Sequence, residues 1–341
     1  MKRPTISDIA EHAGVSKSAV SFALNNRPGV SDRTRARIFA YADALGWYPN
    51  SAARSLSAAK ADLVGLVLAR KPSVMAVEPY FMELVSGIEG QLGTSDVGLV
   101  LKVVGEDLQR EIEIYRRWAA QRRVDGVFIA DVRSDDPRIA ECERLGLPAL
   151  VLSRRVAAEA QRRLPFLSVD VRPAVFALVD HLVTLGHRHI ARVAGPAAMV
   201  HTGDRDRAFV AAARRYGLPE IARVRSDYTA EQGERATRAL LGAEQPATAI
   251  VYDNDIMAVR AIVVARQLGL RVPDELSIIS WEDSLLCELP QPAVTSLHLD
   301  VVALGATAAD MLARQINGAD VADHAFPTSG LVVRGSTGPA R

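Results

Sequence analysis

The sequence is poor in the features that mark secreted proteins, membrane-spanning proteins and proteins stabilised by a bound metal. Its 341 residues include two cysteines, Cys142 and Cys287, which stand far apart and predict neither a disulfide framework nor a zinc site. No apolar run near the N-terminus resembles a signal peptide, and no stretch of about 18 uncharged apolar residues is present. We therefore expect a cytoplasmic protein without a membrane span, a metal or a cofactor.

The motifs of common nucleotide-dependent and hydrolytic enzymes are absent as well. The sequence contains no P-loop, no Gly-x-Gly-x-x-Gly, no Gly-x-Ser-x-Gly and no His-Glu-x-x-His. His187 and His189 look like a metal pair, but a third ligand is lacking nearby. These absences argue against an enzyme, which is one rival function. The other rival, a transport-type binding protein, should carry a signal peptide and should lack a basic segment at its N-terminus.

The net charge of +1 hides an uneven distribution of charge along the chain. The first 60 residues contain nine Lys and Arg against four Asp and Glu, a net charge of +5, which leaves −4 for the remainder. A basic head on a mildly acidic body favours a polyanion as the partner of the head alone. Taken by itself, the asymmetry is also compatible with chance.

Residues 5–46 show the pattern of three short helices. An apolar face on the first ends at Gly14, and Ser16 is a good N-cap for a second helix that runs to Asn25. Ser31 is placed to cap the third helix. This spacing is typical of a helix-turn-helix, although a generic three-helix bundle would show it too.

The second of these helices has two dissimilar faces. At about 100° per residue, small apolar side chains gather on one side, and Lys17, Ser18, Ser21 and Phe22 gather on the other. Lysine donates to guanine acceptors or phosphates, serine serves bases or phosphates, and Phe22 suits a thymine methyl group. A large aromatic side chain on a polar face needs a reason, so we interpret this face as one that reads a major groove.

Several motifs of the head occur together. They are Thr5-Ile-Ser-Asp-Ile-Ala-Glu-His-Ala-Gly-Val-Ser16, Ala19-Val20-Ser21, Leu24-Asn25 and Val30-Ser31, continued by Tyr48-Pro49-Asn50, Ala53-Arg54 and Leu56. This set resembles the lactose-repressor (LacI-type) family of transcription regulators. The resemblance implies a helix-turn-helix domain over 1–48, a hinge helix and linker over 49–60, and an effector-binding core over 61–341.

The resemblance also implies roles for individual residues of the head. In the family, a leucine of the hinge helix, here Leu56, wedges into the central minor groove of a two-fold site. An ordinary core residue of a short linker helix is the alternative for Leu56. The family usually has Arg where this chain has Phe22, which predicts a different operator preference. The predicted DNA-binding residues are Thr5, Ser16, Lys17, Ser18, Ser21, Phe22, Asn25, Ser31, Thr34, Asn50, Ala53, Arg54 and Leu56.

From Leu63 onward, short apolar runs alternate with amphipathic helical stretches. Continuous apolar strands between helices imply parallel sheets that are covered on both faces. So long a segment is large for one open sheet, so we predict an α/β core of two doubly wound lobes. The resemblance gives this core a periplasmic-binding-protein-like fold. We place the N-lobe at about 61–163 and 293–325, and the C-lobe at about 164–292 and 326–341.

The body also contains segments that resemble the family, and they fall where such folds bind ligands, at the carboxyl ends of strands. They are Pro79-Tyr80-Phe81, Arg205-Asp-Arg-Ala-Phe209, Asp253-Asn254-Asp255 and Trp281-Glu282-Asp283. Position by position, the resemblance makes Arg205, Asn254 and Glu282 contacts for a polyhydroxy effector, because each can pair two adjacent hydroxyls. Salt bridges and core packing are the alternatives. The full predicted set is Arg70, Tyr80, Phe81, Ser153, Arg205, Tyr252, Asn254, Trp281 and Glu282.

These expectations combine into one function. We expect a DNA-binding transcription regulator, a repressor, that places a homodimer on a pseudo-palindromic double-stranded operator. A small molecule between the lobes, a sugar or sugar derivative, changes their orientation and thereby the affinity for DNA. Two arginines in the cleft leave room for an anionic effector. The sequence ends without a heptad tail, which favours a dimer over a tetramer.

Overall fold

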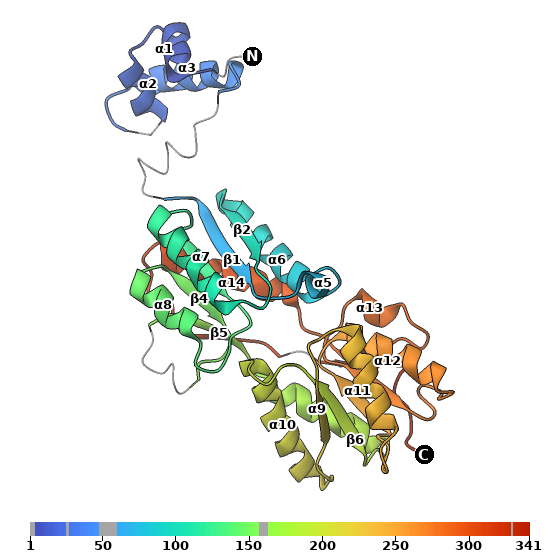
Figure 1. Cartoon of the computed structure of the whole chain (residues 1–341). Helices are drawn as coiled ribbons and strands as arrows, with labels where there is room; N and C mark the ends of the chain where they lie inside the picture. The colour runs from blue at the N-terminus through green and yellow to red at the C-terminus, as the bar shows by residue number, and fades with distance from the viewer. Residues whose placement is uncertain (1–3, 25–26, 48–59, 157–162, 329) are drawn as a thin grey trace. The chain divides into compact units, whose positions relative to one another are not determined.

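The computed structural model describes residues 4–24, 27–47, 60–156, 163–328 and 330–341 (Figure 1). The chain divides into two compact units, Met1–Ala61 and Asp62–Arg341. Residues 49–59 of the predicted hinge helix and linker lie outside the described residues, as do the predicted contacts Asn25, Asn50, Ala53, Arg54 and Leu56. None of the helices that the structure describes is long and apolar enough to cross a membrane.

The first unit is a bundle of three helices, as the sequence predicts: α1 (Ile6–Ala13), α2 (Lys17–Leu24) and α3 (Asp32–Ala44). Gly14 ends α1 in the left-handed conformation, with φ 60°. The Ser16 hydroxyl accepts a hydrogen bond from the Ala19 amide at 3.1 Å, and Ser31 accepts one from the Thr34 amide at 3.3 Å. These bonds satisfy amides at the starts of α2 and α3. The buried core of the bundle consists of Ile9, Ala10, Ala13, Val20, Ala23, Ile38 and Ala42.

The second unit contains two lobes, each built on a six-stranded sheet. The first sheet holds β1 (Leu63–Leu68), β2 (Gly98–Val103), β3 (Gly126–Ile129), β4 (Ala149–Leu152), β5 (Phe166–Val169) and β11 (His324–Phe326). The second holds β6 (Ile190–Ala194), β7 (Ala222–Arg225), β8 (Ala249–Tyr252), β9 (Ser277–Ser280), β10 (Thr295–Leu297) and β12 (Leu331–Val332). The strand orders are β11-β5-β4-β3-β1-β2 and β12-β10-β9-β8-β6-β7, and every pair is parallel except β10 with β12.

Helices cover both faces of each sheet, which explains why the central strands are apolar along their whole length. In the first lobe, α6 (Pro79–Leu92) and α14 (Val301–Ile316) pack on one face, and α7 (Leu108–Gln121) and α8 (Pro137–Leu145) on the other. In the second lobe, α11 (Ala230–Leu241) and α12 (Asp255–Gln267) oppose α9 (Arg172–Thr184) and α10 (Val200–Tyr216). The remaining elements are α5 (Pro72–Met75), the 3-10 turn η1 (Gly93–Ser95) and α13 (Leu285–Glu288).

The lobe boundaries differ from the predicted ones. We expected the C-lobe to begin at 164, but β5 pairs with β4 in the first sheet, so the chain crosses between lobes after Val169. We expected the return to the N-lobe at 293, but β10 pairs with β9 in the second sheet. Phe326 likewise still belongs to β11 of the first sheet. An apolar run looks the same in either lobe, so composition alone misplaces these crossings.

The helices α6 and α14 touch at the level of their backbones. A Cβ atom at Gly87 of α6 would lie 2.0 Å from the carbonyl oxygen of Val302. One at Gly305 of α14 would lie 2.4 Å from the carbonyl oxygen of Leu84. Backbone atoms cannot move aside as a flexible side chain can, so only glycine permits this crossing.

His187, one of the two histidines that looked like a metal pair, has a structural role. Its ring is buried and lies within hydrogen-bond distance of the Thr248 and Ser277 hydroxyls, at 2.9 and 3.0 Å. It also lies 3.0 Å from the carbonyl oxygen of Gly338, so it holds the C-terminal segment against the second lobe. His189, in contrast, is exposed.

Candidate functional site

The head presents the polar face that the helical periodicity predicts on α2. Val20 and Ala23 are buried in the bundle, whereas the side chains of Lys17 and Ser18 are exposed. The Ser16 and Ser18 hydroxyls lie 2.8 Å apart, so these two predicted contacts form a local pair at the N-terminus of the helix. The arrangement leaves a cation and hydroxyl groups at the end of α2 that a helix-turn-helix points into a groove.

Phe22 remains 40% exposed although it is a large aromatic residue. One side of its ring faces the loop before α3, because a Cβ atom at Gly29 would lie 3.5 Å from the ring. Gly29 has φ 109°, a backbone conformation that side chains other than glycine rarely adopt. Packing on this loop explains part of the Phe22 position, and the exposed part of the ring stays available for contact.

A residue that the sequence analysis overlooked connects α2 to α3. Arg35 donates from Nη1 to the Ala23 carbonyl at 3.0 Å and from Nη2 to the Arg27 carbonyl at 3.1 Å. The first of these carbonyls belongs to the last turn of α2, where free acceptors favour a cation. The Ser31 and Thr34 hydroxyls, both predicted DNA contacts, lie 2.9 Å apart at the start of α3.

A cavity of about 190 Å³ lies between the two lobes of the second unit. Its walls are residues that directly follow strands, such as Arg70 and Asp131 in the first lobe and Asp253 and Trp281 in the second. This is the carboxyl edge of both sheets, where open α/β folds bind ligands. Seven of the nine predicted effector contacts line it: Arg70, Tyr80, Phe81, Ser153, Arg205, Trp281 and Glu282.

On the first-lobe side, Arg70 is held in a fixed orientation. Its Nε and Nη2 donate to the two carboxylate oxygens of Asp131 at 2.6 and 2.9 Å. Its guanidinium also lies over the rings of Tyr228, at 4.6 Å, and Phe81, at 5.5 Å. Burial alone would raise the pKa of Asp131, but the charge and hydrogen bonds of Arg70 outweigh it and lower that pKa. The pair therefore presents a guanidinium group and a carboxylate in fixed positions at the cavity wall.

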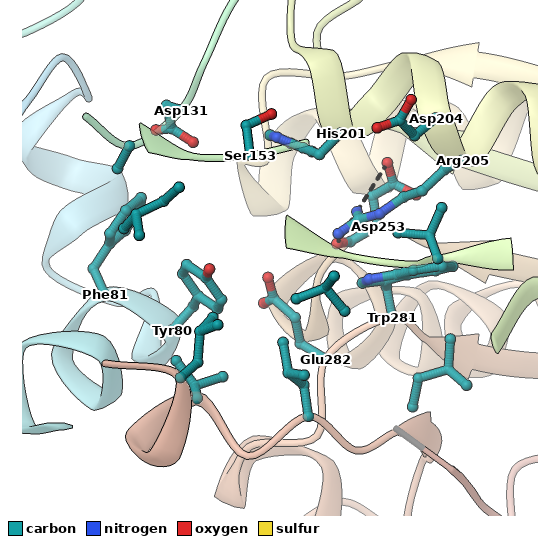
Figure 2. Close-up of a pocket in the computed structure, with 18 of the residues that line it drawn as sticks. Tyr80, Phe81, Asp131, Ser153, His201, Asp204, Arg205, Asp253, Trp281 and Glu282 are labelled. Carbon is teal, nitrogen blue, oxygen red and sulfur yellow. Dashed lines mark hydrogen bonds and ion pairs between the residues drawn. The ribbon is translucent and has the colours of Figure 1, made fainter. Parts of the chain in front are cut away.

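On the second-lobe side, Arg205 lies between an aromatic ring and a buried carboxylate (Figure 2). Its guanidinium lies 4.2 Å from the ring centre of Trp281, and Nη1 is 3.3 Å from Asp253 Oδ2. Asp253 is fully buried and also receives two hydrogen bonds of 2.7 Å from Arg192. Arg205 Nε is buried and has no hydrogen-bond partner, so one donor of this arginine is left for a ligand.

Glu282 points into the cavity between Tyr80 of the first lobe and Trp281 of the second (Figure 2). Its Oε2 is buried and accepts no hydrogen bond. Burial and the nearby charges of Glu78 and Asp255 raise its pKa well above the ordinary value. His201 lines the same cavity, with Nε2 2.8 Å from the Tyr228 hydroxyl, and burial together with Arg205 lowers its pKa to about 4.

The lobes also contact each other directly beside the cavity. Lys71 of the first lobe and Asp227 of the second form an ion pair of 3.0 Å, and Arg154 pairs with Asp204. The Val200 amide donates to the carbonyl of Val132 at 2.9 Å, which joins the two backbones. These contacts hold the lobes together around the cavity.

Two predicted contacts do not line the cavity. Tyr252 is fully buried in the core under α11 and α12, and its hydroxyl lies 2.7 Å from that of Thr237. Asn254 is the N-cap of α12, and its Oδ1 accepts from the Met257 amide at 3.1 Å. Its amide nitrogen donates to the Tyr228 carbonyl at 3.0 Å, so both ends of the side chain are engaged. Tyr252 points into the lobe because strand residues alternate between faces.

The cavity also contains residues that the sequence analysis did not select. Glu78 precedes the Pro79-Tyr80-Phe81 segment, and Asp255 follows Asn254, so neighbouring motifs could have pointed to both. Asp131 and Tyr228 follow strands but belong to no motif that we recognised. Only the three-dimensional convergence of strand ends from both lobes brings these residues together.

The fold and the cavity define a class of protein: a helix-turn-helix head joined to a two-lobed ligand-binding core. Comparison with known families agrees with this class for both parts. Residues 5–50 match the family described as "Bacterial regulatory proteins, lacI family", and residues 179–337 match a "Periplasmic binding protein-like domain".

Similar proteins extend the match to the whole chain. The transcriptional regulator reg1 of Streptomyces lividans is 34% identical over 98% of this chain and 97% of its own, and AglR of Rhizobium meliloti is 31% identical over 98% and 94%. The lac repressor dimer bound to operator and the anti-inducer ONPF has a TM-score of 0.86 at 28% identity, covering 99% of this chain and all of that one. The chain therefore belongs to the LacI family of transcriptional regulators.

Proposed function

We propose that the chain binds a specific operator through α2 and that a small polyhydroxy molecule in the inter-lobe cavity controls this binding. The observation that carries the proposal is the cavity itself, where an arginine fork, an arginine with a free donor and an unpartnered carboxylate surround a space flanked by aromatic rings. Sugars are recognised in this way, with planar polar groups on hydroxyl pairs and rings against apolar faces. The solved CelR–cellobiose complex, a relative at 26% identity and TM-score 0.75, supports a carbohydrate.

The proposal includes a homodimer that represses transcription from a pseudo-palindromic site. A two-fold dimer presents two reading helices to two half-sites, so the symmetry of protein and DNA should match. The relative solved as a repressor dimer on its operator supports this assembly. The chain is further proposed to bind its effector without converting it. A regulator needs an unchanged ligand, because only a bound ligand that persists can shift the equilibrium between lobe orientations.

The decisive experiment compares two arginine variants on operator DNA obtained by in vitro selection with the full chain. Arg205→Ala should remove the response of operator affinity to sugars while it preserves ligand-free binding. Arg214→Ala, an exposed arginine in the last turn of the same helix α10, is the matched control and should respond like the wild type. If the response survives in Arg205→Ala, the effector binds elsewhere. A footprint of monomer size would refute the dimer.

A further inference from the structure

Three carboxylates around the cavity lack a basic partner. Glu78 Oε2, Asp255 Oδ1 and Glu282 Oε2 are all buried and accept no hydrogen bond. Glu78 is 4% exposed and Asp255 is fully buried, so bulk water does not solvate these two side chains, and Glu282 is half-buried. The other oxygen of Asp255 accepts a hydrogen bond from the Ser284 hydroxyl, which is neutral. Among the residues that the structure describes, none of the three forms an ion pair.

Most of the other acids that line the cavity are paired with an arginine, the exceptions among the described residues being the half-buried Glu83 and the exposed Asp170. Asp131 pairs with Arg70, Asp204 with Arg154, and Asp283 with Arg334. Asp253 likewise binds two arginines, so Arg70 and Arg205 each already have a carboxylate partner. The protein therefore holds its buried, unpaired carboxylates at one place in the site. Uncompensated buried charges are costly, which makes them informative about what the site is built to bind.

The three carboxylates come from both lobes, and the charges of neighbouring carboxylates affect the pKa of Glu78 and of Glu282. Glu78 stands at the start of α6 in the first lobe, whereas Asp255 begins α12 and Glu282 follows β9 in the second. Burial, opposed in part by Arg70, raises the pKa of Glu78 to about 7, and the charges of Asp131 and Asp255 contribute. The raised pKa values of Glu78 and Glu282 reflect burial and, in part, the mutual repulsion of the carboxylates, which a bound cation would relieve.

We propose, on the basis of the proposed function, that the effector carries a protonated amine and that Glu78, Asp255 and Glu282 bind its ammonium group. An ammonium carries a positive charge and three N–H donors, which suits a group of unpartnered carboxylates, whereas each hydroxyl of a neutral sugar supplies one donor and no charge. Arg205, Trp281 and the Arg70–Asp131 pair remain for the ring and its hydroxyls. The ligand class is an amino sugar rather than a neutral or anionic one. The described residues include no cluster suited to a metal ion.

Isothermal titration calorimetry of the full chain tests this assignment with matched sugars. The probes are D-glucosamine, D-galactosamine and D-mannosamine, each compared with its parent hexose and its N-acetyl derivative, which lacks the charge. At least one amine should bind at least tenfold more tightly than both neutral partners. Glu78→Gln should abolish this preference because it removes one charge and preserves the shape. Glu113→Gln, an exposed position on α7, is the control and should retain the preference.

A second measurement needs no ligand. Glu78→Gln removes one uncompensated buried charge, so it should raise the Tm of the ligand-free protein at pH 8, and Glu113→Gln should not. An unchanged or lower Tm for Glu78→Gln would overturn the inference, as would equal or tighter binding of the neutral sugars. If a neutral sugar binds and shifts operator affinity, the proposed function stands and the amine assignment fails. If no probe binds or changes operator affinity, both fail.

Discussion

Asp253 joins the core of the second lobe to the cavity, and replacing it by asparagine should destabilise the protein strongly. Its carboxylate accepts two hydrogen bonds of 2.7 Å from Arg192 and one of 3.0 Å from the Gly195 amide. Asp253 is fully buried and Arg192 is 1% exposed, so Asp253→Asn leaves a cation without its main counter-charge in the interior. Breaking a buried pair in this way costs about 3–5 kcal/mol. Arg192 keeps its 2.6 Å ion pair with Asp206. The expected loss in the free energy of unfolding therefore lies near the lower end of this range.

The pH dependence of this loss has a defined sign. Burial opposes ionisation of Asp253, but Arg192 and Arg205 outweigh it and hold its pKa well below the ordinary value. A lowered pKa contributes stability above the pKa of the unfolded chain, about 4, and this contribution disappears as the pH falls toward the folded-state pKa. The difference between wild type and Asp253→Asn should therefore be constant from pH 7 to about pH 5 and narrow below about pH 4.

Urea denaturation followed by circular dichroism measures this difference. Asp274→Asn removes a carboxylate of the same lobe that is 51% exposed and pairs with Arg271 on the surface. Such pairs contribute about 0–1 kcal/mol, so this control should unfold near the wild-type midpoint. A loss below about 1 kcal/mol in Asp253→Asn would refute the argument that the Arg192 pair is a buried, charge-compensated unit.

Three further substitutions test other parts of the molecule. Gly195→Ala places a Cβ atom 2.0 Å from the Tyr228 hydroxyl and should displace the Tyr228 ring from the cavity wall. Effector binding, measured by calorimetry, should weaken about tenfold. An unchanged affinity would show that the Tyr228 ring does not contribute to effector binding. Gly87→Ala drives a Cβ atom into the Val302 carbonyl and should lower the free energy of unfolding in urea by about 1–3 kcal/mol or more. An unchanged free energy of unfolding would mean that the two helices can move apart at no cost. Ser31→Ala removes the N-cap of α3 at a cost of about 1 kcal/mol; fluorescence anisotropy should show weaker operator binding, whereas full affinity would disconnect the cap from the reading face.

The head could be predicted from the sequence because its determinants are local. The caps at Ser16 and Ser31, the left-handed Gly14 and the apolar side of α2 all depend on residues within one or two turns. The apolar runs of the body likewise predicted the central strands. The edge strands β7, β11 and β12 were missed, because none contains a long continuous apolar run; β7, for example, reads Ala-Arg-Val-Arg.

The cavity was only partly predictable because it depends on contacts between distant segments. Motifs located Arg205, Trp281 and Glu282, which follow or face strand ends. They did not locate Asp131, whose partner Arg70 lies 61 positions away. Asn254 was misassigned for a different reason: an amide after a strand looks like a ligand contact, but the following helix uses it as a cap.

The glycine contact between α6 and α14 has a mechanical consequence. The chain enters α14 directly after leaving the second lobe at β10, and α6 begins with the cavity residues Tyr80 and Phe81. Side chains between two helices can absorb a small displacement by changing rotamer, but two backbones in contact offer no such slack. We therefore expect any displacement of α14 to move α6 with it, together with the cavity residues at the start of α6. The backbone contact between α6 and α14 is in this sense a rigid connection between the entry into the first lobe and the cavity wall.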